Sequence, residues 1–165
     1  MNRYLWAVSG DIDSLKMAAL CQFTLAGPPV IYYGTEAGLS QERDVRQGEL
    51  GLPEESRLPM PWGDQQDGEL LSFYRRLVAL RRSEPALRRG SRQSFPCGDK
   101  VVAYRRDTPD QSLAVVINLS EDAQQLEIPG RWVSLLLASR AGAVIKPDNT
   151  STEIEIPGRS GLVMR

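Results

Sequence analysis

The sequence predicts an α+β fold in which a helix–strand–helix part is followed by a small antiparallel β-sandwich. Two stretches with helical periodicity, residues 11–25 and 67–82, flank a short, continuously apolar run at residues 30–33. From about residue 87 onward, segments of four to eight residues alternate with turn signals. We place the boundary near residues 84–90, so that residues 1–86 and 87–165 form separate domains.

Residues 11–25 have the pattern of a helix that packs against a sheet. Asp11 or Asp13 is suited to cap its first turn, because a carboxylate accepts hydrogen bonds from the free backbone N–H groups there. Apolar side chains lie on more than one side, as expected when both flanks are covered. Gly27 and the two prolines after it end the helix.

The run Val30-Ile31-Tyr32-Tyr33 predicts a buried strand. Its residues are β-branched or aromatic and its apolar character is continuous, as in parallel sheets that are covered on both faces. Glu36 follows the run directly. Active sites of α/β proteins collect at the carboxyl ends of such strands. Glu36 is therefore a candidate acid, base or hydrogen-bonding anchor, with a purely structural carboxylate as the alternative.

Residues 40–66 lack periodicity and form an unusually long predicted loop. Its segment RLPMPW, residues 57–62, places Met60 and Trp62 around a proline, which favours an ordered loop laid over a surface. Its many charged residues have the ordinary interpretation of solvated side chains. The rings of Trp62 and Tyr33 are suited either to stack on a sugar or to join the core.

Residues 67–82 form the clearest predicted helix, with Asp67 as its N-cap and apolar residues at spacings of three and four. Pro85 closes it. The strands expected after it are 100–106, 112–119, 124–128, 132–137, 152–156 and 161–164, with 89–94 as a weaker candidate. Many short strands with regular turns predict a small sandwich.

The composition excludes several classes of function. Zero histidines exclude Ser-His-Asp catalysis and histidine-ligated metals. A net charge of −1 gives no electrostatic drive toward nucleic acid or an anionic membrane, so neither is expected as a partner. Cys21 and Cys97 are isolated, which predicts reduced thiols with packing roles. No export signal is recognisable at the N-terminus, which slightly favours the cytoplasm.

Several motifs together resemble the α-amylase family of glycoside hydrolases, the clan of (β/α)8-barrel enzymes. The stretch TLAGPPVIYYGTEAGLS is similar to the region of the eighth barrel strand. The family pattern Gly-x-Pro-x-x-Tyr-Tyr-Gly-x-Glu falls on Gly27, Pro29, Tyr32, Tyr33, Gly34 and Glu36. RLPMPW resembles the Arg-x-Pro-Met-x-Trp segment of the following loop, and MNRYLW resembles the residues after the Asn-His-Asp motif of strand seven. SFYRRLVALRRSEPALRRG and GLVMR are similar to the eighth helix and the last strand of the C-terminal domain.

The resemblance implies that residues 1–86 are a C-terminal remnant of the barrel and that residues 87–165 are the C-terminal β-sandwich domain. The remnant would hold the last two helices, strand eight and its long loop. The implied parent enzyme acts on α-glucosidic bonds of starch-like glucans or maltooligosaccharides by the retaining two-carboxylate route. The family's catalytic carboxylates, and the calcium site of many relatives, belong to upstream motifs. We therefore expect no catalytic residue, metal site or cofactor in this chain, and no activity of the chain alone.

The resemblance leaves four substrate-binding candidates in this chain: Tyr33, Glu36, Arg57 and Trp62. Many relatives have a small polar residue where Leu58 stands, so the contacts of this loop transfer only in part. The expected partner is an α-glucan oligosaccharide. A barrel strand without its neighbours has two unpaired edges. We expect it to pair with a second copy as a homo-oligomer, to join the sandwich sheet, or to stay poorly ordered.

Two alternatives stay open at this point. The chain could be a non-catalytic carbohydrate-binding or scaffolding module that holds sugar through Trp62 or Trp132. It could also be a reading frame that starts at an internal methionine, and an in-frame Asn-His-Asp codon run just upstream would show this.

Overall fold

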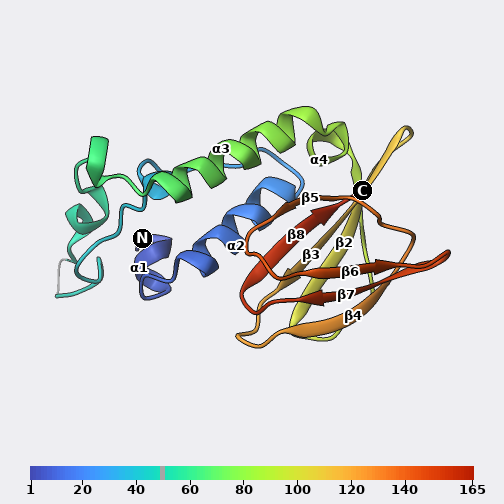
Figure 1. Cartoon of the computed structure of the whole chain (residues 1–165). Helices are drawn as coiled ribbons and strands as arrows, with labels where there is room; N and C mark the ends of the chain where they lie inside the picture. The colour runs from blue at the N-terminus through green and yellow to red at the C-terminus, as the bar shows by residue number, and fades with distance from the viewer. Residues whose placement is uncertain (49–50) are drawn as a thin grey trace.

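The computed structural model describes residues 1–48 and 51–165, and its elements form three layers (Figure 1). Helices α2 (Ile12–Thr24) and α3 (Gly68–Ser83) form the first layer. A five-stranded sheet forms the second layer and a three-stranded sheet forms the third. The mixture of helices and antiparallel sheets confirms the predicted fold class.

The two sheets are antiparallel and have the strand orders β1-β2-β3-β8-β5 and β4-β7-β6. Their strands are β1 (Ser91–Ser94), β2 (Val101–Thr108), β3 (Gln111–Asn118), β4 (Gln124–Pro129), β5 (Leu135–Ala138), β6 (Val144–Pro147), β7 (Ser151–Ile156) and β8 (Ser160–Met164). Each predicted strand of the sandwich is present, although β5 begins three residues later than expected. The sequence analysis missed β6, because a four-residue edge strand that contains Lys146 and Pro147 has no clear apolar alternation.

Both predicted long helices begin at capping aspartates. The Asp11 carboxylate accepts a hydrogen bond from the Asp13 N–H at 3.0 Å, and Asp67 accepts one from the Leu70 N–H at 2.9 Å. Pro85, predicted to close α3, also starts the short helix α4 (Pro85–Arg89), since proline fits the first helical turn. The remaining short helices are α1 (Tyr4–Ala7), η1 (Thr35–Ala37), η2 (Pro53–Arg57) and η3 (Gly63–Gln65).

Strand β3 is buried on both faces and therefore borders two hydrophobic cores. Val115 and Ile117 pack with side chains of α2 and α3. Ala114 and Val116 point the other way and pack with residues of the three-stranded sheet. The five-stranded sheet thus packs against the helices on one face and against the three-stranded sheet on the other. The domain boundary near residues 84–90 stays a prediction.

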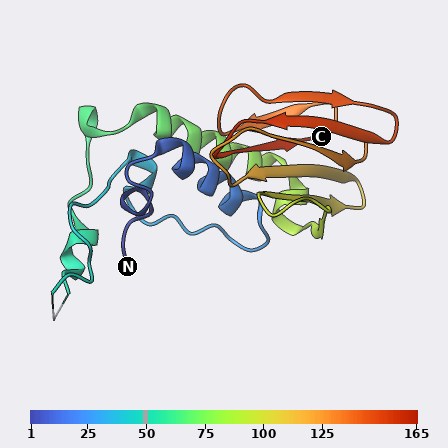
Figure 2. The same cartoon turned by 90° about the horizontal axis from the view of Figure 1, so that it is seen from below.

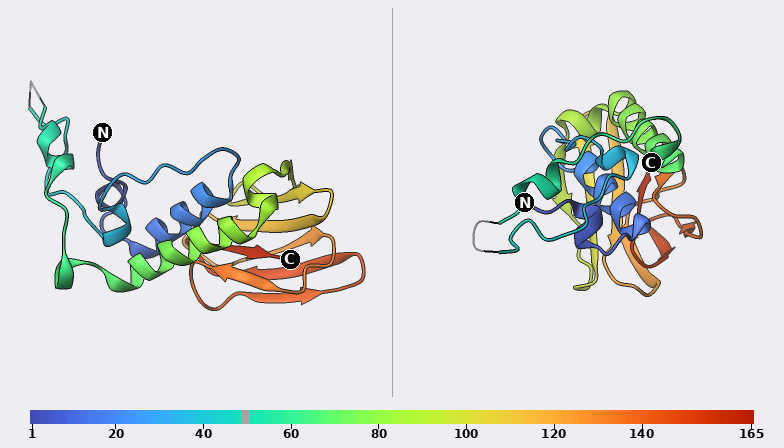
Figure 3. Two further views of the ribbon diagram at one scale, coloured as in Figure 1. Left: turned by 90° about the horizontal axis from the view of Figure 1, so that it is seen from above. Right: turned by 90° about the vertical axis from the view of Figure 1, so that its left-hand side faces the viewer.

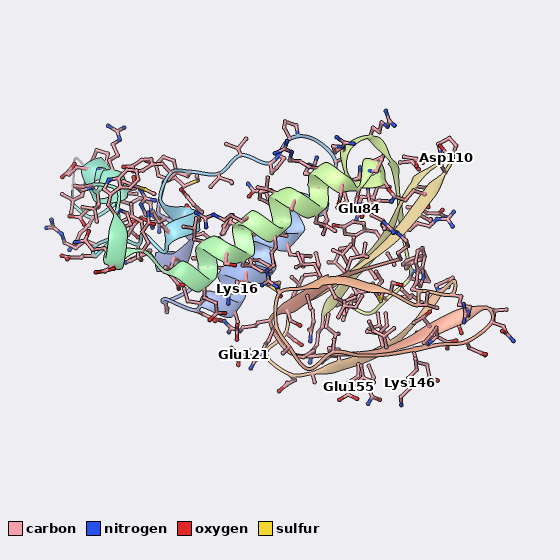
Figure 4. The ribbon with its side chains drawn as sticks, turned by 45° about the horizontal axis from the view of Figure 1, so that its top comes forward. Lys16, Glu84, Asp110, Glu121, Lys146 and Glu155 are labelled. Atoms are coloured by element: carbon pink, nitrogen blue, oxygen red, sulfur yellow. The ribbon has the colours of Figure 1, made fainter. Side chains whose placement is uncertain are left out.

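Two arginines from the sandwich form hydrogen bonds with the two ends of α2. Arg106 is 1% exposed, and its Nη1 donates a hydrogen bond to the Thr24 carbonyl at the end of α2 at 2.6 Å. At the start of the helix, Nη1 of Arg159 donates to the Asp11 carboxylate at 3.0 Å. Arg159 also pairs with Glu121, which Figure 4 labels on the sandwich. These contacts fix the helical layer against the strands at both ends.

The run Val30–Tyr33 is not a strand, which corrects the sequence prediction. It has no regular secondary structure and enters a turn at Tyr33, pairs with no strand among the described residues, and exposes its four side chains by 75, 38, 45 and 40% in order. It does not join the sandwich sheet, since it runs past α2 on the way to the long loop (Figure 3). The physical reason is that a continuously apolar run becomes a buried strand only where neighbouring strands and covering helices are available.

The far part of the long loop projects from the helices (Figure 2), whereas Gln41 and Asp44 near its start are hydrogen-bonded to the N-terminal segment. Its Trp62 is 71% exposed. Glu49 and Leu50 of this loop lie outside the described residues. In residues 1–48 and 51–165, we find no helix with both the length and the apolar character needed to cross a membrane.

Candidate substrate-facing site

A hydrogen bond joins the run Val30–Tyr33 to the RLPMPW segment. The Tyr33 hydroxyl donates to the Leu58 carbonyl at 2.9 Å. The rings of Tyr32 and Tyr33 meet edge to face with centroids 5.0 Å apart, an arrangement that the ring quadrupoles favour. The bond uses only the backbone of Leu58, so it does not depend on the side chain at this position. Tyr33 is therefore bonded to the backbone of the loop that carries Arg57 and Trp62.

Gly34 makes the turn that presents Glu36. Its φ of +81° lies in the left-handed region, and a Cβ there would come within 2.7 Å of the Leu39 side chain. The Leu39 N–H closes the turn by donating to the Gly34 carbonyl at 2.8 Å. The sequence pattern Tyr-Gly-Thr-Glu thus has a local structural cause, since only glycine fits both requirements.

Glu36 is a half-buried carboxylate beside the helical layer. Its Oε2 atom is buried and has no hydrogen-bond donor among the described residues. Burial raises the pKa of Tyr74 on α3 to about 12, and the negative charge of Glu36 adds to this shift. The carboxylate therefore lies close enough to Tyr74 to act on it electrostatically, and its buried Oε2 accepts no hydrogen bond within the described chain.

Arg57 and Trp62 lie on the exposed surface of the loop. Among the described residues, neither side chain forms a hydrogen bond or ion pair with another side chain. Gln66 stabilises this segment, because its Nε2 donates to the Pro61 carbonyl at 3.0 Å. The indole of Trp62 presents a free face on which a planar or ring-shaped ligand could stack. The structure does not bring Arg57 or Trp62 into contact with Glu36.

Sequence reasoning missed Arg3, which lies at the centre of this region. Arg3 is 3% exposed, and its guanidinium carbon lies 4.7 Å from the ring centroid of Tyr32 and 4.8 Å from that of Tyr33. Its Nη1 donates to the Tyr33 carbonyl at 2.8 Å, whereas Nε and Nη2 have no acceptor within the described chain. The sequence signal was its place in MNRYLW, but its burial depends on residues about thirty positions away.

A polar network holds the N-terminal segment against the loop. The Gln41 side chain accepts from the Arg3 N–H at 2.6 Å and donates to the Asn2 side chain at 2.8 Å. Asn2 in turn donates to the Asp44 carboxylate at 3.1 Å. Hydrogen bonds from Arg46 hold the pKa of Asp44 well below its usual range, so Asp44 is ionised at neutral pH.

A cavity of about 390 Å³ opens between the N-terminal segment, α2 and the run Val30–Tyr32. Its lining combines apolar side chains with Arg3, Gln22, Thr35 and Tyr74. Within the described ranges, no group of three or more Cys, Asp or Glu residues could hold a metal ion. The four predicted site residues, Tyr33, Glu36, Arg57 and Trp62, are not among the residues that line this cavity.

Trp132 does not form a sugar-binding platform, which corrects one of the alternatives. It is 8% exposed and packs in the core between the two sheets, where its ring meets Phe95 edge to face. Its Nε1 donates to the Pro129 carbonyl at 2.9 Å. Cys21 and Cys97 are free thiols as expected, but Cys97 is exposed and so lacks the predicted packing role.

Comparison with known proteins places the chain in a family. Its sequence is 38% identical over 135 residues to "Alpha-amylase 2" of Dictyoglomus thermophilum, a match that covers 81% of this chain and 24% of that protein. A "Cyclomaltodextrinase" of Geobacillus thermopakistaniensis is 32% identical over 149 residues, covering 86% of this chain and 24% of the relative. No protein-family model matches the sequence.

Solved structures agree with the sequence matches. The α-amylase from H. orenii superposes with a TM-score of 0.74 at 27% identity, over 99% of this chain and 37% of that chain. The chain belongs to the α-amylase family and corresponds to a C-terminal part of its enzymes. The debranching enzyme from Nostoc punctiforme shares the fold, with a TM-score of 0.81 at 24% identity over 99% of this chain and 33% of that chain.

This α-amylase-family chain spans about a quarter of the length of the curated relatives that it matches. The described residues therefore correspond to one portion of those longer proteins. The described geometry confirms the fold of this portion, and the roles of the individual site residues remain predictions.

Proposed function

We propose that this chain serves as the C-terminal part of an enzyme that acts on α-glucosidic bonds of starch-like glucans or maltooligosaccharides. The observation that carries the proposal is the 38% identity over 135 residues to a protein named for α-amylase activity. Cyclomaltodextrinases, a neopullulanase and amylopullulanases among the other relatives support the same class of substrate. The partner expected at the site is an α-glucan oligosaccharide.

The proposed role of the site is to bind substrate, not to perform the chemistry. A retaining glycosidase needs two carboxyl groups about 5 Å apart across the scissile bond. Glu36 is the one carboxylate among the predicted site residues, and its position beside Tyr74 suits a hydrogen-bonding anchor. Trp62 would stack on a sugar ring and Arg57 would donate to sugar hydroxyls, while Tyr33 holds the loop in place through Leu58.

Two measurements test this function. The purified chain, incubated with soluble starch or maltoheptaose, should release no reducing ends above buffer. A chimera in which the matched 135-residue segment of the Dictyoglomus relative is replaced by that of this chain should hydrolyse starch. Turnover by the chain alone, or a folded chimera without activity, would argue against the proposal.

The exposed indole of Trp62 favours a second candidate, a carbohydrate-binding module. In this case the isolated chain would bind maltoheptaose and change its tryptophan fluorescence. The variant Trp62→Ala would lose the response, while Trp132→Phe in the sandwich core would keep it. If millimolar maltoheptaose does not change the tryptophan fluorescence of the chain, the first proposal, that the chain is part of an enzyme, is favoured.

A further inference from the structure

A groove separate from the candidate site lies where α2, α3 and β5 meet. Its volume is about 520 Å³, which is in the range of small-molecule sites. It is lined by Asp13 and Lys16 of α2, Glu69 and Arg76 of α3, and the consecutive residues 135–141. None of the four residues predicted to bind glucan is among them. The groove therefore has walls of its own and can hold a ligand independently of the candidate site.

Lys16 brings a buried positive charge to the groove, at the place where α2 and α3 run side by side (Figure 4). Its side chain is 10% exposed, and its ammonium group pairs with the Glu69 carboxylate. An ammonium group has three donors, and the described residues offer an acceptor to one of them. Glu69 is 82% exposed, so it can leave Lys16 and remain hydrated. Glu69 is therefore a replaceable partner of Lys16.

Arg76 gives the groove an excess of positive charge. It forms no ion pair among the described residues. Its guanidinium carbon lies 5.5 Å from the ring centroid of the buried Phe73, a cation–π contact that helps to position it. The other guanidinium in the groove, that of Arg140, is paired with Asp13 at 3.4 Å. Because Lys16 is paired as well, Arg76 is the cation left without a counter-ion, and the expected ligand is an anion.

The charge balance favours a phosphate group over a carboxylate. A carboxylate would replace Glu69 at Lys16, one charge for one, and would leave Arg76 unpaired. A phosphate monoester carries about −1.5 to −2 charges at neutral pH and has three strong acceptor oxygens. It can therefore serve Lys16 and Arg76 together, since both side chains line the same groove. Hydrogen bonds between ionised groups of this kind are roughly twice as strong as those between neutral groups.

The β5 side of the groove fits the organic part of such an ester. β5 is the last strand of its sheet, and residues 135–141 line the groove without alternation, so the strand turns an edge toward it. A strand edge has free backbone N–H and C=O groups, which can bond hydroxyls. The register shift between Leu135 and Leu137 interrupts regular pairing and disfavours an added polypeptide strand. The Ser139 hydroxyl accepts from the Gly161 N–H at 2.9 Å and keeps its own proton to donate.

We propose that this groove binds a small organic phosphate. The phosphate group of the monoester takes the place of Glu69 at Lys16 and pairs with Arg76, while its hydroxylated part bonds the edge of β5. The proposal goes beyond the proposed function and does not rest on it, because the groove is formed without Tyr33, Glu36, Arg57 or Trp62.

Isothermal titration calorimetry on the full chain, in a buffer without phosphate, compares three probes. Glucose 6-phosphate represents the ester, inorganic phosphate represents the anion alone, and glucuronate represents a hydroxylated ligand with a single charge. We expect the ester to bind at about 1 mM or below, with inorganic phosphate and glucuronate each about tenfold weaker. An ester that fails to bind at about 10 mM, or that binds no more tightly than inorganic phosphate or glucuronate, would overturn the proposal.

Matched variants of α3 locate the binding in the groove. Arg76→Gln removes a charge from the groove and should weaken binding of glucose 6-phosphate about tenfold. Arg75→Gln removes the same charge from an exposed neighbour that does not line the groove, so it should leave the affinity unchanged. Lys16→Met should also weaken binding about tenfold or more, while far-UV circular dichroism reports whether this variant is folded. Equal losses in Arg76→Gln and Arg75→Gln would show general charge attraction and would overturn the site.

Glu69 provides a test in which the sign of the effect decides. Its carboxylate competes with the phosphate group for Lys16, so Glu69→Gln should tighten binding of glucose 6-phosphate about 2- to 5-fold. A carboxylate that instead held the hydroxyls of the ligand would make the same substitution weaken binding. Weaker binding by Glu69→Gln would therefore contradict the displacement of Glu69 and the proposal with it.

Discussion

Leu20 and Gly161 provide a direct test of the core shared by the helices and the sandwich. Leu20 is fully buried on α2, and Gly161 lies opposite on β8. A Cβ added at Gly161 would lie 3.1 Å from Leu20 Cδ2 and 3.6 Å from Ile117 Cγ1. The glycine therefore allows α2 to approach the sheet closely, and the leucine fills the space that the missing side chain leaves.

The expected changes in the free energy of unfolding follow from this contact. Leu20→Ala removes a fully buried side chain and should lower the free energy of unfolding by about 3–5 kcal/mol, because the rigid sheet cannot collapse onto the cavity. Gly161→Ala forces the new methyl group into an unusually tight contact with Leu20. This overpacking should lower the free energy of unfolding by about 1–3 kcal/mol. In the double variant the new methyl group enters the space that Leu20 vacated. The loss should therefore be smaller than the sum of the two single losses by at least about 1 kcal/mol.

Urea unfolding followed by tryptophan fluorescence and far-UV circular dichroism measures these changes. In a Trp62→Phe background, Trp6 reports on α1 and Trp132 reports on the sandwich core. We expect one coincident transition for both probes in every variant. Two separate transitions, with Leu20→Ala shifting only the helical one, would refute the shared core. Additive losses in the double variant would refute the contact between Leu20 and Gly161.

Three further changes probe single groups. Burial raises the pKa of Tyr74 to about 12, against an ordinary value of 10.0. The contribution of the neutral Tyr74 side chain to the free energy of unfolding is therefore complete below pH 10 and is lost as the pH rises toward 12. Tyr74→Phe should flatten this loss in urea titrations between these pH values. Burial opposes ionisation of Asp11, but hydrogen bonds from Ser14, Arg159 and the Asp13 N–H outweigh it and lower the pKa of Asp11 below 3.8. The contribution of Asp11 to the free energy of unfolding is therefore present above about pH 4 and disappears as the pH falls through the folded-state pKa. Asp11→Ala should cost about 1–2 kcal/mol at neutral pH and weaken the acid dependence of thermal unfolding. Glu84, labelled at the end of α3 in Figure 4, accepts a hydrogen bond from Arg165 at 2.5 Å, and Glu84→Ala should cost about 1–3 kcal/mol in the same unfolding assay.

The helices and most strands were predictable because their signals are local. An aspartate followed by helical periodicity caps α2 and α3 wherever the rest of the chain lies. Short segments separated by turn residues mark β2, β3, β4, β7 and β8 in the same way. The sequence analysis missed edge strand β6, because a short strand beside solvent needs no apolar alternation.

The candidate site was predictable only where a motif is continuous in the sequence. Tyr33, Glu36, Arg57 and Trp62 come from two such motifs, and the structure joins them through the bond from Tyr33 to Leu58. Arg3 was missed because its role arises from stacking against rings that lie far along the chain. Nothing in the local sequence distinguishes such an arginine from a solvated one.

The sequence by itself determined the two long helices, most strands of the sandwich and the family likeness, since each depends on neighbouring residues or on a continuous motif. The tertiary structure alone decided that α2 shares a core with β3 and β8, that Arg3 is buried, and that Val30–Tyr33 stays exposed and unpaired. The same apolar run can be a buried strand or an open edge. Which one it becomes depends on whether other segments cover it, because burial is a property of the packed chain and not of the residues that are buried.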